Sequence, residues 1–468
     1  MSQPLHIPQH THLHTPLHIV VLAAGEGTRM KSKLPKVLHT LGGRPMLLHL
    51  LESAAALEPA AIHVVVGNGA ERVREACAAH AVDWVLQDER RGTGHAVLQA
   101  MPHIPDAAAV LVLLGDHPLV PLGALQEMCG ARDAPLAVLT MVVDDPAGYG
   151  RVVRDLDGDI TAVVEERDAT PEQRTINEVS TGIILAGAAR LRGWLAALGC
   201  DNAKHEYYLT DIFSMAHGQR LDIRGVIAPD ARDLLGANDR RQLASLEQRY
   251  RALRAAALMD AGAQIIDPAR VDIRGQVELG SDVMIDVNVV LDGDNRLGDG
   301  VLIGPGAVVK NCDLAAGTRV HAHSVLEGVT TTGPCDIGPF ARLRPGTVLA
   351  AGCRIGNFVE TKNARLGEGS KASHLTYLGD TEIGSHVNIG AGTITCNYDG
   401  ANKHRTVIED EVFVGSNTAL VAPVTVHRGA TIGAGSTISK DAPADALTLG
   451  RPRQTTVKGW KRPVKKEP

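Results

Sequence analysis

Aliphatic residues recur at every sixth position over much of the second half of this 468-residue chain. The first run covers 273–309, a second covers 337–355 and a third covers 408–438. Glycine follows several of these residues, as in Ile303-Gly304. An α-helix needs a period of 3.6 residues, so a six-residue period excludes it and predicts a parallel β-helix. Each hexapeptide would form one short strand and one turn, with the aliphatic residue pointing inward and the glycine permitting a tight corner.

The chain up to about residue 235 has a different hydropathy pattern, in which short apolar runs alternate with amphipathic stretches. Buried strands are expected at 18–23, 62–66 and 109–114, with helices at 46–57 and 70–79 between them. This alternation predicts a parallel α/β sheet. A single apolar stripe with helical spacing over 239–260 predicts one long connecting helix.

These patterns divide the chain into four segments. We expect an α/β domain at 17–238, a linker helix at 239–262, and a β-helix with a C-terminal tail at 263–468. The remaining segment, 1–16, holds His6, His10, His12 and His14 among polar residues and prolines. A metal-binding tail is conceivable there, but nothing in it can build a core, which favours a disordered extension.

Composition excludes several classes of protein. The net charge of −6, from 47 Lys and Arg against 53 Asp and Glu, leaves no basic footprint for nucleic acid. No run of about 18 apolar residues is present, so no membrane span is expected. The N-terminus lacks the pattern of a secretory signal. The seven cysteines form no CxxC pair, and we expect reduced, buried thiols in a cytoplasmic protein.

A glycine-rich turn at 22–30 follows the first expected strand. It is not a P-loop, because no Gly-Lys-Ser/Thr follows, and Met30 stands where a dinucleotide fingerprint needs its third glycine. Alone, such a turn fits a phosphate cradle or a mere tight turn equally well. The run Leu34-Pro35-Lys36 lies just downstream, so Arg29 and Lys36 would add positive charge where a triphosphate would lie.

The LAAGxGTRM run and the LPK run resemble those of sugar-phosphate nucleotidyltransferases. Together with the hexapeptide repeat, they make the chain resemble, over 17–465, the bifunctional bacterial N-acetylglucosamine-1-phosphate uridyltransferases/glucosamine-1-phosphate acetyltransferases. The resemblance implies an α/β plus all-β fold, with a Rossmann-like nucleotidyltransferase domain, a long linker helix and a left-handed parallel β-helix. It also implies a homotrimer in which coenzyme A lies between neighbouring subunits.

The same resemblance implies two reactions. The C-terminal domain would use acetyl-CoA to acetylate glucosamine 1-phosphate. The N-terminal domain would then transfer uridylyl from UTP to N-acetylglucosamine 1-phosphate with Mg²⁺, releasing pyrophosphate. The product, UDP-N-acetylglucosamine, supplies peptidoglycan and lipopolysaccharide synthesis, and so cell-wall biogenesis and cell shape. In-line attack asks mainly for positioning and charge neutralisation, which Arg29 and Lys36 would supply as catalytic residues.

Site residues of the N-terminal domain follow from matching motifs. Asp116 ends a buried strand, where ligands of α/β sheets bind, and by resemblance it holds the metal together with Asn238. Either residue could instead be a helix cap. Ser180 stands where the family usually has Asn, which shortens its reach to the sugar. The residues that the resemblance assigns to UDP-N-acetylglucosamine are Leu22, Ala23, Ala24, Gly25, Lys36, Gln87, Gly92, Thr93, Gly150, Glu165, Ser180 and Asn238.

Residues 371–380 interrupt the repeat and contain His374. Acetylating an amine requires a base that titrates near neutral pH, and by resemblance His374 is that base, oriented by Glu360. The residues implied to bind the amino-sugar phosphate are Arg344, Lys362, Tyr377 and Asn388. Those implied to bind acetyl-CoA are Ala391, Asn397, Tyr398, Ser416, Ala434 and Arg451. Arg453 is an alternative to Arg451, and 395–403 form a loop that breaks the repeat.

Two alternative interpretations give the β-helix a role other than acetyl transfer. The chain could be a monofunctional nucleotidyltransferase with a regulatory solenoid. The β-helix could also be a structural trimerisation module without chemistry. The His374 motif argues against both.

Overall fold

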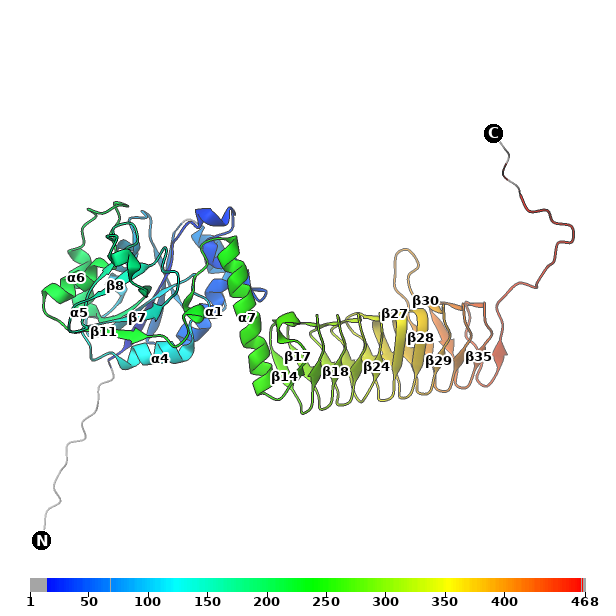
Figure 1. The fold of residues 1–468 in the computed structure, drawn as a ribbon. Coiled ribbons are helices and arrows are strands. Elements are labelled where there is room, and N and C mark those ends of the chain that lie inside the picture. The colour runs from blue at the N-terminus through cyan, green and yellow to red at the C-terminus, as the bar shows by residue number, and fades with distance from the viewer. Residues whose placement is uncertain (1–14, 68, 464, 466–468) are drawn as a thin grey trace, which may run out of the picture. The chain divides into compact units, whose positions relative to one another are not determined.

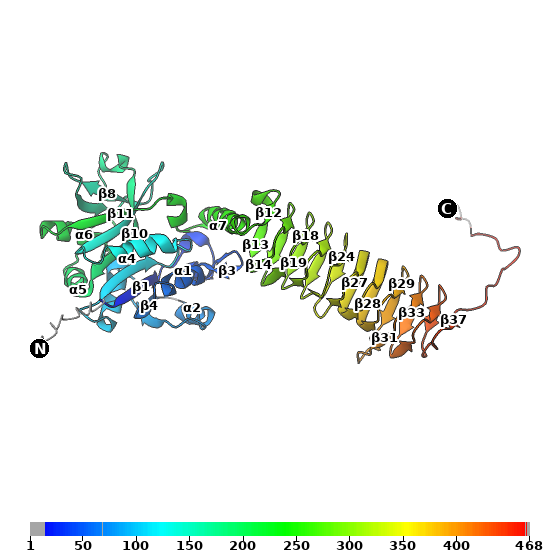
Figure 2. The ribbon, with the colours of Figure 1, turned by 90° about the horizontal axis from the view of Figure 1, so that it is seen from below.

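The computed structural model describes residues 15–67, 69–463 and 465, so most of the expected N-terminal extension lies outside the described residues. The chain divides into two compact units, 1–250 and 251–468, and each is described by itself. The ribbon is drawn in Figures 1 and 2.

The first unit is built on a sheet with the strand order β11-β7-β10-β6-β1-β4-β5. The three predicted strands are β1 (Leu17–Ala23), β4 (Ala61–Val66) and β6 (Ala109–Leu114). The remaining strands are β5 (Asp83–Leu86), β7 (Leu136–Val142), β8 (Gly150–Arg154), β9 (Ile160–Val164), β10 (Glu178–Gly187) and β11 (Ile223–Ile227).

The predicted parallel pairing holds for β1 with β4 and β6, for β4 with β5 and for β7 with β11, but not for the strands around β10. β10 runs antiparallel to both of its neighbours in the sheet, β6 and β7. The antiparallel pair β8–β9 lies between β7 and β10 in the chain, and β10 pairs with β8. A hairpin reverses the chain without the helix that a parallel crossover requires, which is the physical reason for the exception.

Helices cover both faces of this sheet (Figure 2). One face packs against α1 (Met46–Ala55), α2 (Ala70–Ala76) and α4 (Leu122–Gly130), and the other against α3 (Thr93–Ala100), α5 (Ala188–Ala196) and α6 (Asp211–Gly218). Successive residues of β1 serve the two cores, since Ile19 and Val21 belong to the first and Val20 to the second. Burial on both faces explains why these strands appear in the sequence as unbroken apolar runs.

The predicted connecting helix is α7 (Arg240–Asp260). Its N-cap is Asp239, whose side chain accepts hydrogen bonds from the backbone N–H groups of Arg241 and Gln242 at 2.8 and 2.9 Å. The boundary between the two units falls inside this helix.

The second unit is a parallel β-helix, as predicted. Within the described residues, 26 strands from β12 (Gln264–Ile265) to β37 (Leu447–Thr448) form one sheet. Figure 1 shows the solenoid that they build. Within its regular part each strand pairs in parallel with the strand three places further on, so three strands make one coil. Ile273 of β13 (Asp272–Arg274) stacks on Leu291 of β16 (Val290–Asp292), and Leu291 stacks on Val309 of β19 (Val308–Lys310). Each of these coils is therefore three hexapeptides long.

Slips in the six-residue period are changes in coil length. Val309 stacks on Leu326, and Leu326 on Leu343, so each of these coils falls a single residue short of three hexapeptides. The largest change follows the long strands β27 (Arg354–Leu366) and β28 (Lys371–Ile383). Ile383 of β28 stacks on Ile408 of β31 (Thr406–Ile408), a step longer than four hexapeptides. The extra residues form the predicted loop after β30 (Ile394–Cys396), which projects from the solenoid in Figure 1.

The glycine after an inward aliphatic residue has another role than the one expected. A Cβ added to Gly298 would lie 2.6 Å from the backbone nitrogen of Ala316 in the next coil. The residue is therefore small because adjacent coils approach closely. The left-handed corner falls two residues later, at Gly300, whose φ is +65° and whose added Cβ would have no atom of the described residues within 4 Å.

All seven cysteines are free, as expected. The prediction that they are buried is confirmed for Cys77, Cys312, Cys335 and Cys353, while Cys200 is exposed. Burial raises the pKa of the Cys77 thiol to about 11. Among the described residues, no helix has the length and apolar character needed to cross a membrane.

Candidate active sites

A cavity of about 740 Å³ opens at the carboxyl ends of β1 and β6. Nine residues that the sequence assigned to the nucleotide and metal sites line it: Leu22, Ala23, Ala24, Gly25, Lys36, Gln87, Gly92, Thr93 and Asp116. The sequence reasoning missed four charged residues of the lining, Glu26, Asp88, Arg90 and Glu206. Glu26 and Arg90 form an ion pair. Three of the four could have been found from the sequence, since Glu26 lies within the predicted glycine-rich turn and Asp88 and Arg90 follow Gln87 closely.

Lys36 connects the two predicted metal ligands. Its ammonium forms an ion pair with Asp116 and donates a 3.0 Å hydrogen bond to Oδ1 of Asn238. The side chains of Lys36 and Asp116 are only 14% and 13% exposed. Since Asp239 caps α7, the side chain of Asn238 is free to face Lys36, and the alternative in which Asn238 is the cap is wrong. Gly27 packs directly on the Lys36 stem, because an added Cβ would lie 2.6 Å from the lysine Cβ.

The electrostatics of this site keep Asp116 ionised. Burial alone would raise the pKa of its carboxyl, but the charges of Lys36 and His117 and a hydrogen bond from Lys36 lower it below its usual range. Burial lowers the pKa of the neighbouring His117. The carboxylate of Asp116 and the side-chain oxygen of Asn238 thus both contact the ammonium of Lys36.

That donor set fits Mg²⁺, which prefers oxygen ligands and is commonly held by one or two carboxylates, substrate phosphates and water. Across the described part of the chain, no group of three His, Cys, Asp or Glu side chains could hold a metal by itself. A bound Mg²⁺ would therefore need further ligands from the nucleotide or from water.

The turn that leads into α3 is held by Gln87. Its side-chain nitrogen donates to the carbonyl of Gly92 at 3.3 Å and lies 3.0 Å from Nδ1 of His95. Gly92 has a φ of +111°, and an added Cβ would lie 2.6 Å from the carbonyl oxygen of Tyr207. Only glycine fits this position, so the turn at Gly92 is a close backbone approach held by the buried amide of Gln87.

Three of the residues assigned to UDP-N-acetylglucosamine lie together outside the lining of this cavity. Gly150 pairs with Ser180 across β8 and β10, and an added Cβ on Gly150 would lie 4.0 Å from Oε1 of Glu165. The Ser180 hydroxyl accepts a 3.1 Å hydrogen bond from the backbone N–H of Gly182, so one of its lone pairs serves the local turn. Arg29 is exposed on the short helix 28–30 and does not line the cavity.

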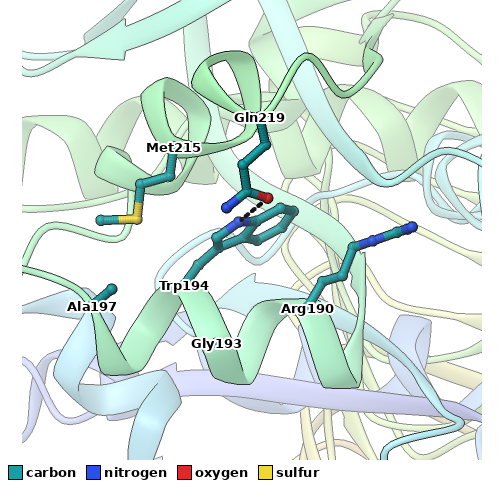
Figure 3. A pocket seen from close by; sticks show the side chains of 6 residues that line it. All are labelled: Arg190, Gly193, Trp194, Ala197, Met215 and Gln219. Atoms are coloured by element: carbon teal, nitrogen blue, oxygen red, sulfur yellow. Dashed lines mark hydrogen bonds between the residues drawn. The ribbon is translucent and has the colours of Figure 1, made fainter.

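A second hollow, of about 530 Å³, lies over α5 and α6 (Figure 3). Its lining comprises Arg190, Gly193, Trp194, Ala197, Met215 and Gln219. The indole N–H of Trp194 donates to the side-chain oxygen of Gln219 at 3.3 Å. None of these lining residues belongs to a predicted site.

In the second unit, His374 heads a column of stacked residues. Parallel pairing of β27 with β28 sets Asn357 directly against His374. The same register, continued one coil at a time, extends the column through three predicted acetyl-CoA residues, Ala391, Ser416 and Ala434. At its end, the Arg451 guanidinium donates a 2.7 Å hydrogen bond to the carbonyl of Ala434.

The expected partner of His374 is not the observed one. Nδ1 of the imidazole lies 2.8 Å from the side-chain oxygen of Asn357. Glu360 instead accepts a 3.0 Å charged hydrogen bond from Arg344 and pairs in register with Tyr377. Glu360 pairs with Arg344 because a guanidinium offers a carboxylate a stronger partner than an imidazole does.

Cations gather where the amino-sugar phosphate was predicted. Arg344 lies beside Glu360, and a hydrogen-bonding contact with Lys403 lowers the pKa of Lys362. Lys403 was missed as a site residue, although it lies in the loop that breaks the repeat. Asn388 is set apart from this group, since it stacks on Lys371 of the preceding face.

Asn397 and Tyr398 lie at a different corner of the coil from His374. The Asn397 amide donates to Asp380, which also accepts a 2.8 Å hydrogen bond from Asn363. Tyr398 is 61% exposed, and its hydroxyl donates to the carbonyl of Gly400 at 2.6 Å. Asp380 follows His374 by six positions, a span of up to about 20 Å at about 3.3 Å per residue. The predicted acetyl-CoA residues are thus divided between two edges of one face.

Known proteins share both halves of this arrangement. Residues 19–208 match the MobA-like NTP transferase domain family, and residues 405–440 match six repeats of the bacterial transferase hexapeptide family. The bifunctional protein GlmU of Stenotrophomonas maltophilia (strain K279a) is 55% identical over 96% of this chain and 99% of its own.

The chain belongs to the GlmU family. The bifunctional protein GlmU of Alkalilimnicola ehrlichii is 55% identical over 96% of both chains, and that of Xylella fastidiosa (strain M12) is 54% identical over 97% of this chain and 99% of its own. The predictions of the family and of the fold class are confirmed. As predicted, the chain is a transferase that combines a nucleotidyltransferase domain with a hexapeptide-repeat domain.

Proposed function

We propose that the two units catalyse consecutive steps of UDP-N-acetylglucosamine synthesis. As a member of the GlmU family, the chain is a bifunctional uridyltransferase and acetyltransferase, as the sequence predicted. In this proposal the second unit acetylates glucosamine 1-phosphate with acetyl-CoA, and the first unit joins the product to the uridylyl group of UTP. The observation that carries it is the cavity at the ends of β1 and β6, whose lining includes nine of the predicted site residues. Both reactions would take place in the cytoplasm.

For uridylyl transfer, Asp116 and Asn238 would hold Mg²⁺, whose charge neutralises the phosphates of UTP. Lys36 adds a fixed positive charge at the same place. Gln87 and the Gly92 turn form the part of the wall against which the pyrimidine would lie. The chain's own contribution is positioning and charge compensation, since the sugar phosphate is the nucleophile.

For acetyl transfer, the cationic group of Arg344, Lys362 and Lys403 would hold the sugar phosphate. His374 would take a proton from the amino group, because Nε2 remains available once Nδ1 faces Asn357. Arg451, which lies at the far end of the His374 column, suits the phosphates of coenzyme A better than Arg453, the other candidate.

We also propose a homotrimer. An exposed apolar ridge supports it, formed by Phe340, Phe358 and Leu375, which are 49%, 57% and 61% exposed. All three have φ between +46° and +59°, which bulky residues avoid, and the two phenyl rings stack 5.7 Å apart. Exposed apolar surface of this kind favours an intermolecular contact. The division of the acetyl-CoA residues between two corners also favours a site completed by a second subunit.

A substrate panel on the wild-type chain tests the proposal. Acetyl-CoA and succinyl-CoA, with UTP and dTTP, are offered against glucosamine 1-phosphate and N-acetylglucosamine 1-phosphate. We expect turnover of acetyl-CoA with the free amine, and Mg²⁺-dependent pyrophosphate release from UTP with the acetylated sugar. The alternative of a purely structural or regulatory β-helix predicts pyrophosphate release without any acetyl transfer.

A further inference from the structure

The imidazole of His374 has a partner other than the expected carboxylate of Glu360. Asn357 lies opposite His374 in the β27–β28 register, and its side-chain oxygen lies 2.8 Å from Nδ1. Because the two residues are paired through their backbones, the contact follows from the coil itself. An amide oxygen can only accept, so Nδ1 must carry the hydrogen and Nε2 must present its lone pair.

The predicted carboxylate is not placed to do this work. Glu360 pairs in register with Tyr377, three residues beyond His374 and past the corner at Leu375. Its carboxylate is engaged by Arg344 at 3.0 Å. Asn357 is thus the side chain that meets the ring, and it brings no charge to it.

We propose that Asn357 is the positioning residue of the acetyltransferase, which orients His374 and fixes its tautomer. This inference rests on the proposed role of His374 as base. As the sugar nitrogen attacks the thioester carbon, the C–N bond forms and the nitrogen gives its proton to Nε2. The C–S bond then breaks, its electron pair stays on sulfur, and the proton passes from Nε2 to the coenzyme A thiolate. An imidazole free to rotate, or protonated at Nε2, could not accept that proton.

A double-mutant cycle tests the pair, with acetyl transfer followed by radiolabelled acetyl-CoA. Asn357→Ala should lower kcat roughly 10- to 100-fold while leaving KM for both substrates within about twofold. In a His374→Ala background, the same substitution should change kcat by less than about twofold, because there is no ring left to orient. Asn357→Asp, which keeps an accepting oxygen at the same place, should retain most of the activity.

Two controls separate positioning from folding. Each variant should release pyrophosphate from UTP at the wild-type rate, and Arg354→Ala, an exposed residue of the same strand, should leave acetyl transfer unchanged. An equal loss for Asn357→Ala in both backgrounds, or no loss at all, would overturn this inference and leave His374 as base. Full activity of His374→Ala would instead overturn the proposed base, and this inference with it.

Discussion

The ammonium of Lys36 donates a 3.0 Å hydrogen bond to the side-chain oxygen of Asn238, 202 residues away in the chain. The same ammonium pairs with Asp116 at the end of β6. A residue after the glycine-rich turn, one at the end of a strand and one beside the linker helix thus share one charged contact. This contact joins the predicted phosphate-binding turn to the two predicted metal ligands.

Replacing Lys36 should separate the two activities. Lys36→Met keeps much of the apolar stem but removes the charge, and we expect uridylyl transfer to fall at least 100-fold, since charge neutralisation supplies much of this reaction's rate. Acetyl transfer should be unchanged. Lys33→Met, at an exposed lysine of the same loop, is the matched control. Equal activity of the two variants in a pyrophosphate-release assay would remove Lys36 from the mechanism.

The cationic group on the β-helix should govern affinity for the amino sugar. Lys403→Ala should raise KM for glucosamine 1-phosphate about tenfold, because a charged hydrogen bond to phosphate contributes roughly 1.5 kcal/mol. KM for acetyl-CoA should change little. Lys440→Ala, an exposed lysine elsewhere on the β-helix, serves as the control. A rise in KM for acetyl-CoA alone would mean that this group holds the other substrate.

Alanine substitutions at two neighbouring glycines should lower the free energy of unfolding by different amounts. Gly298→Ala places a methyl group 2.6 Å from the Ala316 backbone and should destabilise the β-helix by about 2 kcal/mol, the usual scale of overpacking. Gly300→Ala meets no described atom within 4 Å and bears only the cost of its positive φ, about 1 kcal/mol. Urea unfolding followed by circular dichroism gives both values. The reverse order would contradict a spacing set by contact between coils.

Stability of the first unit should depend on pH through its buried histidines. Burial lowers the pKa of His18 and His63, whose rings stack 5.3 Å apart and hydrogen bond at 3.0 Å. The folded pKa values lie below the unfolded value of about 6.5, so the unfolded chain binds protons first as pH falls. The neutral pair therefore stabilises the fold above about pH 6.5, and this contribution is lost as pH falls from there towards the folded pKa values.

Unfolding in urea at pH 7.5 and 5.5 measures this effect. Trp84 and Trp194 report on the first unit once Trp460→Phe removes the third tryptophan. The free energy of unfolding should be lower at pH 5.5, and the double variant His18→Val/His63→Val should reduce the difference. A difference of the same size in that variant would assign the pH dependence to other groups.

Local patterns predicted the elements of this fold well. The six-residue period predicts the β-helix because an inward column of aliphatic residues leaves a direct record in sequence, and the stripe at 239–260 predicts α7 within one residue. The antiparallel β10 escaped prediction, because strand direction is set by connections rather than by side-chain pattern. Coils that are one residue shorter than three hexapeptides were likewise not predicted. They interrupt the six-residue period in the sequence, although their aliphatic residues still stack in the structure.

Site residues were predictable where a motif carried them, and less so where a partner decides the contact. Lys36 and Asp116 lie in recognisable runs and meet in the structure. Glu360 was expected to serve His374, but Arg344 holds it. Nothing local to the sequence shows that Asn357 lies opposite His374, since that depends on the length of one particular coil.

The most direct test of two separate active sites is a pair of variants assayed for both reactions. Asp116→Ala should abolish uridylyl transfer and leave acetyl transfer at the wild-type rate. His374→Ala should lower acetyl transfer by about 10²- to 10⁴-fold, the usual effect of a general base, and leave pyrophosphate release near normal. Loss of both activities in either variant, or of neither in both, would contradict the assignment of one reaction to each unit.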